Sequence, residues 1–166
     1  MRAFRWFRIA LFPRPLLLLL LLIVAGFACN NDDVSGTGGA LARLEMDMPD
    51  TVRSGVPFDA GASAANVGVE GVHDGVVTIT LPAPLRITDV TASPGTAATF
   101  SNVGLATVTW TLHTLDSNTR STITIYAKGS LPPGAGEQLL TAQATMVADG
   151  ISLGELVAND SFVLAP

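Results

Sequence analysis

The feature that most constrains this chain is a two-residue alternation of apolar and polar side chains through its C-terminal three quarters. In residues 107–113, Val108, Trp110 and Leu112 fall on one face, and three threonines and His113 fall on the other. This period is that of a β-strand with one buried face. No stretch shows a convincing 3.6-residue apolar period, so the chain is expected to fold from strands.

The same alternation recurs along the rest of the chain. Its segments are Leu44–Met48, Phe58–Ala64, Val77–Leu81, Ile123–Ala127 and Leu140–Met146, with a last strand over Ser161–Leu164. Turn formers separate them, among them Ser54-Gly55, Asn66-Val-Gly68, Asp74-Gly75, Pro94-Gly95, Asp116-Ser-Asn118, Pro132-Pro-Gly134 and Asp149-Gly150. About seven to nine such strands predict an all-β fold, a single immunoglobulin-like antiparallel β-sandwich. Trp110 is its expected core anchor, joined by Phe58, Phe100 and Ile125.

Charge separates the first 28 residues from the rest of the chain. Residues 1–28 contain four of the nine basic residues and no acidic residue, and the 138 that follow contain five basic and fourteen acidic residues. The net charge of −5 therefore becomes −9 once the N-terminal segment is set aside. This balance excludes a basic nucleic-acid binder, so no nucleic-acid partner is expected. Residues 40–166 have the length of one domain.

The N-terminal segment has the pattern of an export signal. Arginines at positions 2, 5 and 8 precede an apolar run over Leu16–Ala28. Thirteen helical residues span about 20 Å, which is short of the roughly 30 Å of a membrane's hydrocarbon core. Pro13, Arg14 and Pro15 interrupt any longer run. A signal peptide over residues 1–28 is therefore predicted, and a retained N-terminal anchor is the alternative.

Cys29, the single cysteine of the chain, directly follows this segment. With Ala28 before it, the segment resembles a bacterial lipoprotein signal, although Gly26 and Phe27 depart from the usual residues. The resemblance implies cleavage before Cys29, lipidation of that residue and attachment to the membrane through its acyl chains. Residues 29–39 are polar and would serve as a flexible linker. The alternative is an ordinary secretory signal in which Cys29 is an incidental thiol.

The residue after the cysteine bears on which membrane would hold such a lipoprotein. In bacteria with two membranes, the lipoprotein family's sorting favours the outer membrane when the residue after the cysteine is not aspartate. This chain has Asn30 at that position. The resemblance therefore implies a lipid-anchored envelope protein in the outer membrane, on its periplasmic or surface face, rather than in the inner membrane.

The C-terminal domain has a resemblance of its own. Strand and turn motifs at Val76–Leu85, Val90–Gly95, Val108–Leu115, Arg120–Ile125 and Val157–Ser161 resemble the immunoglobulin-like conserved repeat domain of bacterial and archaeal surface proteins, a domain of unknown function. The similarity covers roughly residues 48–164. In this family an asparagine-rich turn closes the domain, and Val157–Ser161 occupies its position.

The chain departs from this family at one motif, and a second family is also similar to it. The family's usual asparagine-threonine-glycine step is only loosely matched by Asn66-Val-Gly68. Cohesin-like sandwiches are similar in architecture and strand spacing. Neither family implies catalytic residues. A non-enzymatic envelope protein that presents its domain for protein binding, adhesion or assembly is therefore expected, and an accessory carbohydrate-binding or cohesin-like module is the alternative.

Candidate sites for chemistry are few. His73 lies beside Glu70 and Asp74, where a surface metal or a pH-sensitive contact is conceivable, and His113 lies on a polar strand face. Two solvated histidines are the simpler interpretation, because no cysteine ligands or short histidine spacing accompany them. No catalytic residue, metal site or cofactor is therefore predicted.

Two further features of the sequence bear on binding. Asp149-Gly150 and Asn159-Asp160 could contribute to a calcium site, but they are explained at least as well as turns. The polar strand faces are rich in threonine, and flat faces of this kind can bind carbohydrate or protein, although solvated sheet faces often share this composition.

Overall fold

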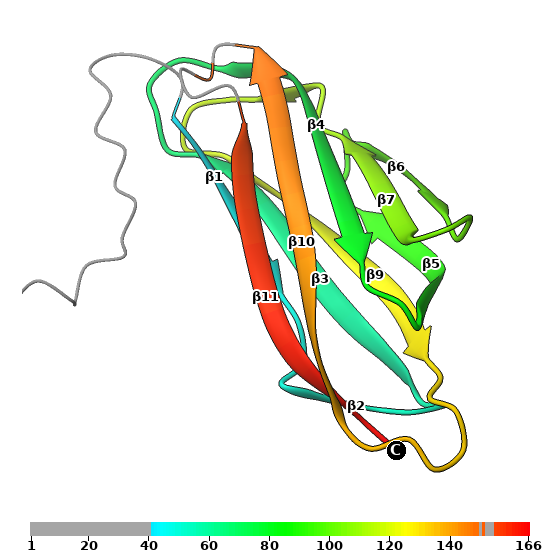
Figure 1. The fold of residues 1–166 in the computed structure, drawn as a ribbon. Helices are drawn as coiled ribbons and strands as arrows, with labels where there is room; N and C mark the ends of the chain where they lie inside the picture. Colours follow the sequence, from blue (N-terminus) through cyan, green and yellow to red (C-terminus); the bar gives the residue numbers. More distant parts are fainter. Residues whose placement is uncertain (1–40, 150, 152–154) are drawn as a thin grey trace, which may run out of the picture. The chain divides into compact units, whose positions relative to one another are not determined.

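The computed structural model describes residues 41–149, 151 and 155–166, in which every helix or strand element is a β-strand (Figure 1). In these ranges no helix has the length and apolar character needed to cross a membrane. The predicted signal peptide at residues 1–28 and the predicted linker at 29–39, which includes Cys29, lie outside the described residues.

The strands form two sheets. The smaller sheet has the strand order β1-β3-β9-β5, and these are β1 (Ala42–Asp47), β3 (Pro57–Asn66), β9 (Arg120–Gly129) and β5 (Leu85–Ala92). The larger sheet has the order β2-β11-β10-β4-β7-β6, with β8 paired to β4. Its strands are β2 (Thr51–Arg53), β11 (Leu156–Ala165), β10 (Gln138–Asp149), β4 (Val72–Leu81), β7 (Ala106–Thr111), β6 (Ala97–Ser101) and β8 (Thr114–Leu115). Among the strands that the structure describes, only β2 and β11 pair in parallel.

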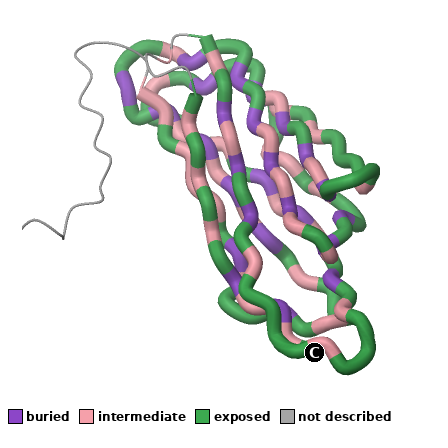
Figure 2. Tube along the Cα trace, in the orientation of Figure 1, coloured by how far each residue is buried: buried purple, intermediate pink, exposed green. Residues whose placement is uncertain are grey.

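The two sheets pack face to face, and this confirms the predicted all-β sandwich. Buried residues alternate with more exposed ones along most of the longer strands (Figure 2), and the buried apolar residues form the core between the sheets. In β3, for example, Ala60, Ala62 and Ala64 are buried while the residues between them are more exposed. One contiguous core fills the space between the sheets.

The described residues form eleven strands, more than the seven to nine predicted, because two of the eleven are short strands that the sequence pattern does not indicate. Nine strands have five or more residues, and the short ones are β2 and β8. β8 follows β7 after a break at Leu112 and His113. The facing residues of β4 bridge this break, since the amide of Asp74 donates to the carbonyl of His113 at 2.7 Å and that of Leu112 donates to Gly75 at 2.8 Å. The predicted turn at Asp74-Gly75 is therefore wrong, because both residues lie within β4.

The last strand is also longer than predicted. β11 begins at Leu156, and Asn159 and Asp160 lie inside it, where a turn was expected. Its register with β10 is continuous from Leu156 to Leu164. Pairing along β10 therefore outweighs the local preference of asparagine and aspartate for turns.

Trp110 is fully buried in the core, as predicted. Phe162 of β11 is its largest buried companion, and the ring of Phe58 lies 6.5 Å from that of Phe162, centroid to centroid. The prediction for Phe100 was wrong, because this residue remains 40% exposed. It points inward beside Val108, but it lies on the edge strand β6, so a neighbouring strand, β7, flanks it on one side only.

Asn66 is the one buried polar residue among those that the structure describes. Its amide nitrogen donates to the carbonyls of Glu70 at 2.7 Å and Leu115 at 2.9 Å, and its side-chain oxygen accepts from the amide of Gly68 at 2.9 Å. The side chain thereby joins the end of β3, the loop that follows it and β8. It supplies the hydrogen bonds that these buried backbone groups lack from a sheet.

Candidate interaction face

The outer face of the larger sheet is a continuous surface across five strands. We call it the threonine face, and its eighteen residues are Val157, Asn159, Ser161 and Val163 of β11, Leu139, Thr141, Gln143, Thr145 and Val147 of β10, Val76, Thr78 and Thr80 of β4, Thr107, Thr109 and Thr111 of β7, and Ala97, Thr99 and Ser101 of β6. Eight of the eighteen are threonine. Because strand residues alternate in direction, the buried partners of these positions build the core.

Strand register places the threonines in rows. One row runs Val157, Thr145, Thr78, Thr109 and Thr99 across all five strands. The next row runs in the same direction through Asn159, Gln143, Thr80, Thr107 and Ser101. Side chains directly opposite in neighbouring strands lie about 5 Å apart, so the hydroxyl groups form a regular array.

No charged residue is among these eighteen; the nearest outward charges of the same sheet are Asp149, at the next outward position after Val147, and Arg53 of β2, beside Ala165. The outer face of the smaller sheet differs, because it contains Arg43, Glu45, Asp47, Asp59, Arg86, Asp89, Arg120 and Lys128. Glu45 there accepts from Arg43 at 2.9 Å and also pairs with Arg120, which donates to Ser63 at 2.8 Å. The two outer faces of the sandwich are thus chemically distinct.

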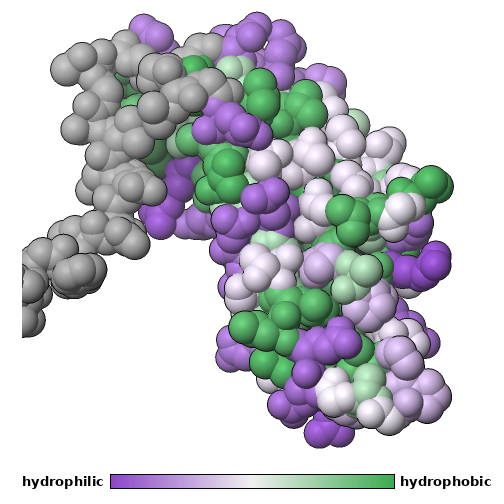
Figure 3. All heavy atoms as spheres, viewed as in Figure 1, coloured by the Kyte–Doolittle hydropathy of each residue, from purple (hydrophilic) through white to green (hydrophobic). Residues whose placement is uncertain are grey.

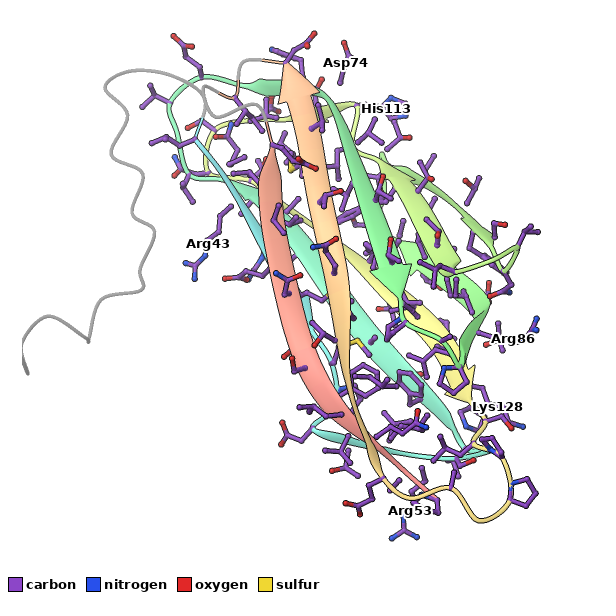
Figure 4. All side chains as sticks on the ribbon, viewed as in Figure 1. Arg43, Arg53, Asp74, Arg86, His113 and Lys128 are labelled. Atoms are coloured by element: carbon purple, nitrogen blue, oxygen red, sulfur yellow. The ribbon has the colours of Figure 1, made fainter. Side chains whose placement is uncertain are left out.

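Figure 3 shows the side of the larger sheet, where pale and green side chains occupy much of the centre and right of the view, with purple ones among them. The labelled side chains of Arg43, Arg53, Arg86 and Lys128 project from the margins of the domain (Figure 4). Among the apolar residues, Val76 and Val147 pair directly and are 38% and 54% exposed.

At each side of the sandwich, where an edge of one sheet meets an edge of the other, a polar side chain makes hydrogen bonds between the two sheets. On one side Asp160 of β11 accepts from the amide of Met48, just after β1, at 2.7 Å. The other carboxylate oxygen accepts from the amide of Ser161 at 2.8 Å. An inward-pointing carboxylate that engages edge backbone groups opposes the addition of another strand.

Asn102 closes the opposite side. It follows β6 and contacts β5 of the other sheet, where it accepts from the amide of Ile87 at 2.9 Å and donates to the carbonyl of the same residue at 2.8 Å. β5 also has an irregular register between Ile87 and Asp89. Both features make β5 a poor template for a further strand.

Replacement of Asp160 tests how firmly the first side is closed. We expect Asp160→Ala to lower the free energy of unfolding by about 1–3 kcal/mol, because the amide of Met48 loses its acceptor in a part-buried position. Asp160→Asn retains an acceptor oxygen and should cost less. Urea denaturation followed by circular dichroism measures both, and Asp149→Ala, at an exposed carboxylate, is the matched control. Equal losses in Asp149→Ala and Asp160→Ala would contradict the assigned role.

The predicted histidines lie near one end of the larger sheet and are both exposed. The Nδ1 atom of His73 lies 3.4 Å from the hydroxyl of Thr114, while His113 and Asp74 have positive φ values of 35° and 50° at the break between β7 and β8. In residues 41–149, 151 and 155–166, no group of three or more histidine, cysteine, aspartate and glutamate side chains is placed to hold a metal ion.

The candidate calcium positions are not brought together into such a group. Asp149 ends β10, whereas Asn159 and Asp160 lie within β11. The carboxylate of Asp160 is occupied by two backbone amides. A shallow hollow of about 330 Å³ lies elsewhere, beside Asp47 and Asp59 on the smaller sheet.

Comparison with known proteins identifies the fold but not a family. No protein-family model matches the chain, and no curated protein matches it. Solved structures do match. A CARDB domain from Pyrococcus furiosus, crystallised with di-metal ions, superposes with a TM-score of 0.56 at 15% identity, covering 82% of this chain and 100% of that domain.

Two further structures have the same fold. The major pilin subunit of Bacillus cereus gives a TM-score of 0.54 at 14% identity, covering 76% of this chain and 40% of the pilin. A cohesin module from a Clostridium perfringens family 33 glycoside hydrolase gives 0.53 at 10% identity, covering 78% of this chain and 98% of the module. The domain is thus an immunoglobulin-like, cohesin-like β-sandwich of the kind found in these modules.

Sequence reasoning missed the residues that close the sandwich. Asn102 was not singled out, and Asp160 was interpreted as a turn former. A signal for Asp160 does exist in the chain, because Leu156, Ala158, Phe162 and Leu164 alternate on either side of it. The partners of both residues, however, lie far away in sequence, so no local pattern names them.

Proposed function

We propose that this chain is a non-enzymatic, lipid-anchored protein of the bacterial cell envelope, which presents its sandwich domain for protein binding or assembly. The observation that carries the proposal is the position of Cys29. The single cysteine of the chain directly follows Ala28 at the end of an apolar run and precedes a polar stretch.

Acylation of Cys29 would explain this arrangement physically. One acyl chain gives marginal membrane affinity, whereas two or three give stable anchoring. Eleven residues separate Cys29 from Leu41, the first described residue. At no more than about 3.6 Å per residue, such a segment can hold the domain up to about 40 Å from the membrane surface. We place the anchor in the outer membrane, because Asn30 rather than aspartate follows the cysteine.

The fold supports a binding role in preference to chemistry. The domain has the fold of a pilin subunit and of a cohesin module, whose names indicate assembly and interaction modules. The chain's own contribution is the threonine face, an uncharged surface spanning five strands. Depletion of charge is a property of the buried centres of protein interfaces.

A second candidate function is an accessory module that serves a carbohydrate-processing enzyme. The likeness to a cohesin module from a glycoside hydrolase favours it. Binding of the purified protein to neutral polysaccharides, against its binding to envelope proteins, separates the two candidates.

Membrane fractionation of a Cys29→Ser variant tests the anchor. Wild-type protein is expected almost entirely in the outer-membrane fraction, and the variant is expected to lose this attachment because serine offers no thiol for acylation. As a control, the double variant Cys29→Ser/Ser35→Cys keeps one cysteine but moves it into the linker, and it should not restore attachment. A soluble wild-type protein, or full attachment of Cys29→Ser, would contradict the anchor.

A further inference from the structure

We propose that the threonine face is a self-association surface, on which a second copy of this chain docks with the same face. The proposal deepens the proposed function, because it names the surface and the partner through which the domain assembles. Four features of the described residues carry it: charge, chemical self-complementarity, size, and closure of the sandwich sides.

Charge distribution selects this face for contact between identical copies. The described residues include five basic and twelve acidic side chains, so two copies repel one another over most of their surfaces. None of these seventeen side chains is among the eighteen residues of the threonine face, and the outward residues Asp149 of β10 and Arg53 of β2 lie at its two ends. Two copies that meet over the central rows bury no charge and avoid the cost of bringing like charges together.

The chemistry of the face complements itself. A threonine hydroxyl both donates and accepts, so a surface of threonines can hydrogen-bond to an identical surface without a different partner. The hydroxyls of Thr141 and Ser161 already make such a pair within the face, at 2.9 Å. Val76, Val147 and Val157 add apolar area at one end, each more than a third exposed.

The face is large enough for a reversible contact. Five strands spaced about 4.8 Å apart, with about seven residues each at about 3.4 Å, cover roughly 500 Å². Stable interfaces bury about 800 Å² per partner, and weak ones bury less. Two flat sheet faces can pack about 10 Å apart with a modest rotation. We therefore expect a concentration-dependent dimer.

Other modes of association are disfavoured by the same structure. Asp160 engages the backbone just after β1 and Asn102 engages that of β5, so the two edges of the smaller sheet are poor sites for a further strand. A glycan would be expected to stack on aromatic rings, and the threonine face has none; Tyr126 lies on the opposite outer face. The remaining broad surface of the described domain is the charged face of the smaller sheet.

The position of the linker is compatible with pairing on one membrane. The linker joins the domain at Leu41, whose carbonyl accepts from Val67 and Gly68 at the end where β3 finishes. A two-fold axis along the strands would bring two threonine faces together while both linkers leave from the same end. Two anchored copies could then pair side by side, at the raised local concentration of a membrane.

Sedimentation of the full chain in detergent, over a range of concentrations, tests the proposal. Wild type is expected to shift from monomer to dimer. Thr109→Lys, in the central row of the face, should weaken the dimer at least tenfold because like charges then oppose each other. Thr122→Lys is the matched control, since both threonines are exposed and lie in interior strands on opposite faces. Thermal unfolding of each variant verifies that it is folded.

Cross-linking in membranes gives an independent readout. With a short bis-maleimide, Thr109→Cys should form a covalent dimer and Thr122→Cys should not. A wild type that stays monomeric at all concentrations overturns the proposal. A dimer that Thr109→Lys leaves intact, or that Thr122→Lys weakens equally, overturns it too. The sedimentation outcomes are independent of whether Cys29 anchors the chain, because that arm needs no membrane. In the cross-linking arm, the wild type is run alongside to report any reaction of Cys29 itself.

Discussion

Replacing Trp110 with alanine is expected to lower the free energy of unfolding by about 3–5 kcal/mol, the largest effect of any single substitution considered. Trp110 is fully buried near the C-terminal end of β7, and alanine would leave a cavity between the sheets. No disulfide can compensate, since the chain has one cysteine. Urea denaturation followed by far-ultraviolet circular dichroism measures the loss.

Trp110→Phe separates the ring's packing from its polar group. The Nε1 atom of Trp110 is buried and has no hydrogen-bond partner among the described residues. Phenylalanine removes this unpaired donor while it keeps most of the apolar contact, so the loss should be less than half that of Trp110→Ala. An alanine variant that costs less than about 1 kcal/mol would contradict the position of Trp110 in the core.

Asn66→Ala is expected to cost about 2–4 kcal/mol, the second largest effect. The change leaves the carbonyls of Glu70 and Leu115 and the amide of Gly68 without the partner that joins them. The same denaturation measurement tests it. Asn118→Ala, at an exposed turn asparagine, serves as the control and should change stability by no more than about 0.5 kcal/mol. Equal losses in the two variants would contradict the role of Asn66.

Asn66→Asp adds a pH dependence whose sign follows from the same contacts. An aspartate at this position would direct a carboxylate oxygen at two carbonyls, so its pKa in the folded variant should rise above the unfolded value. Below the unfolded pKa, about 3.9, the protonated acid can donate one hydrogen bond. The stability deficit relative to wild type should therefore shrink as pH falls from 7 to 4 and below. A deficit that grows on acidification would contradict this arrangement.

The alternation of side chains was enough to predict the sandwich and most of its core. Trp110, Ile125 and Ala144 point inward as expected, because burial of one face imposes a period of two on each strand by itself. Phe100 does not follow this reasoning. The alternation within β6 is enough to predict that Phe100 points inward. Its exposure depends on the edge position of β6, which only the pairing of distant strands determines.

The same limit applies to turns. Asn159-Asp160 and Asp74-Gly75 have local preferences for turns, but both lie in strands. β10 pairs alongside the first, and Leu112 and His113 hydrogen-bond to the second. Gly95 and Gly134, by contrast, form turns as expected, each with a φ of 80°. Local preference prevails where no neighbouring strand offers hydrogen bonds.

The candidate face could be predicted only in part. The three threonines of β7 were expected on one polar face, and they lie there. That Thr99, Thr78 and Thr145 continue this row depends on register across four strands, which the sequence of each strand does not specify. The absence of charge over the whole face is visible only once the strands are in order.

The most direct test of the central claim, that Cys29 anchors the chain, is the intact mass of the protein extracted from bacterial membranes, followed by sequencing of its N-terminal peptide. We expect a mature chain that begins at Cys29 and carries a diacylglyceryl group on sulfur, usually with a further acyl group on the amine. A protein with an unmodified Cys29 thiol, whether cleaved elsewhere or uncleaved, would contradict it.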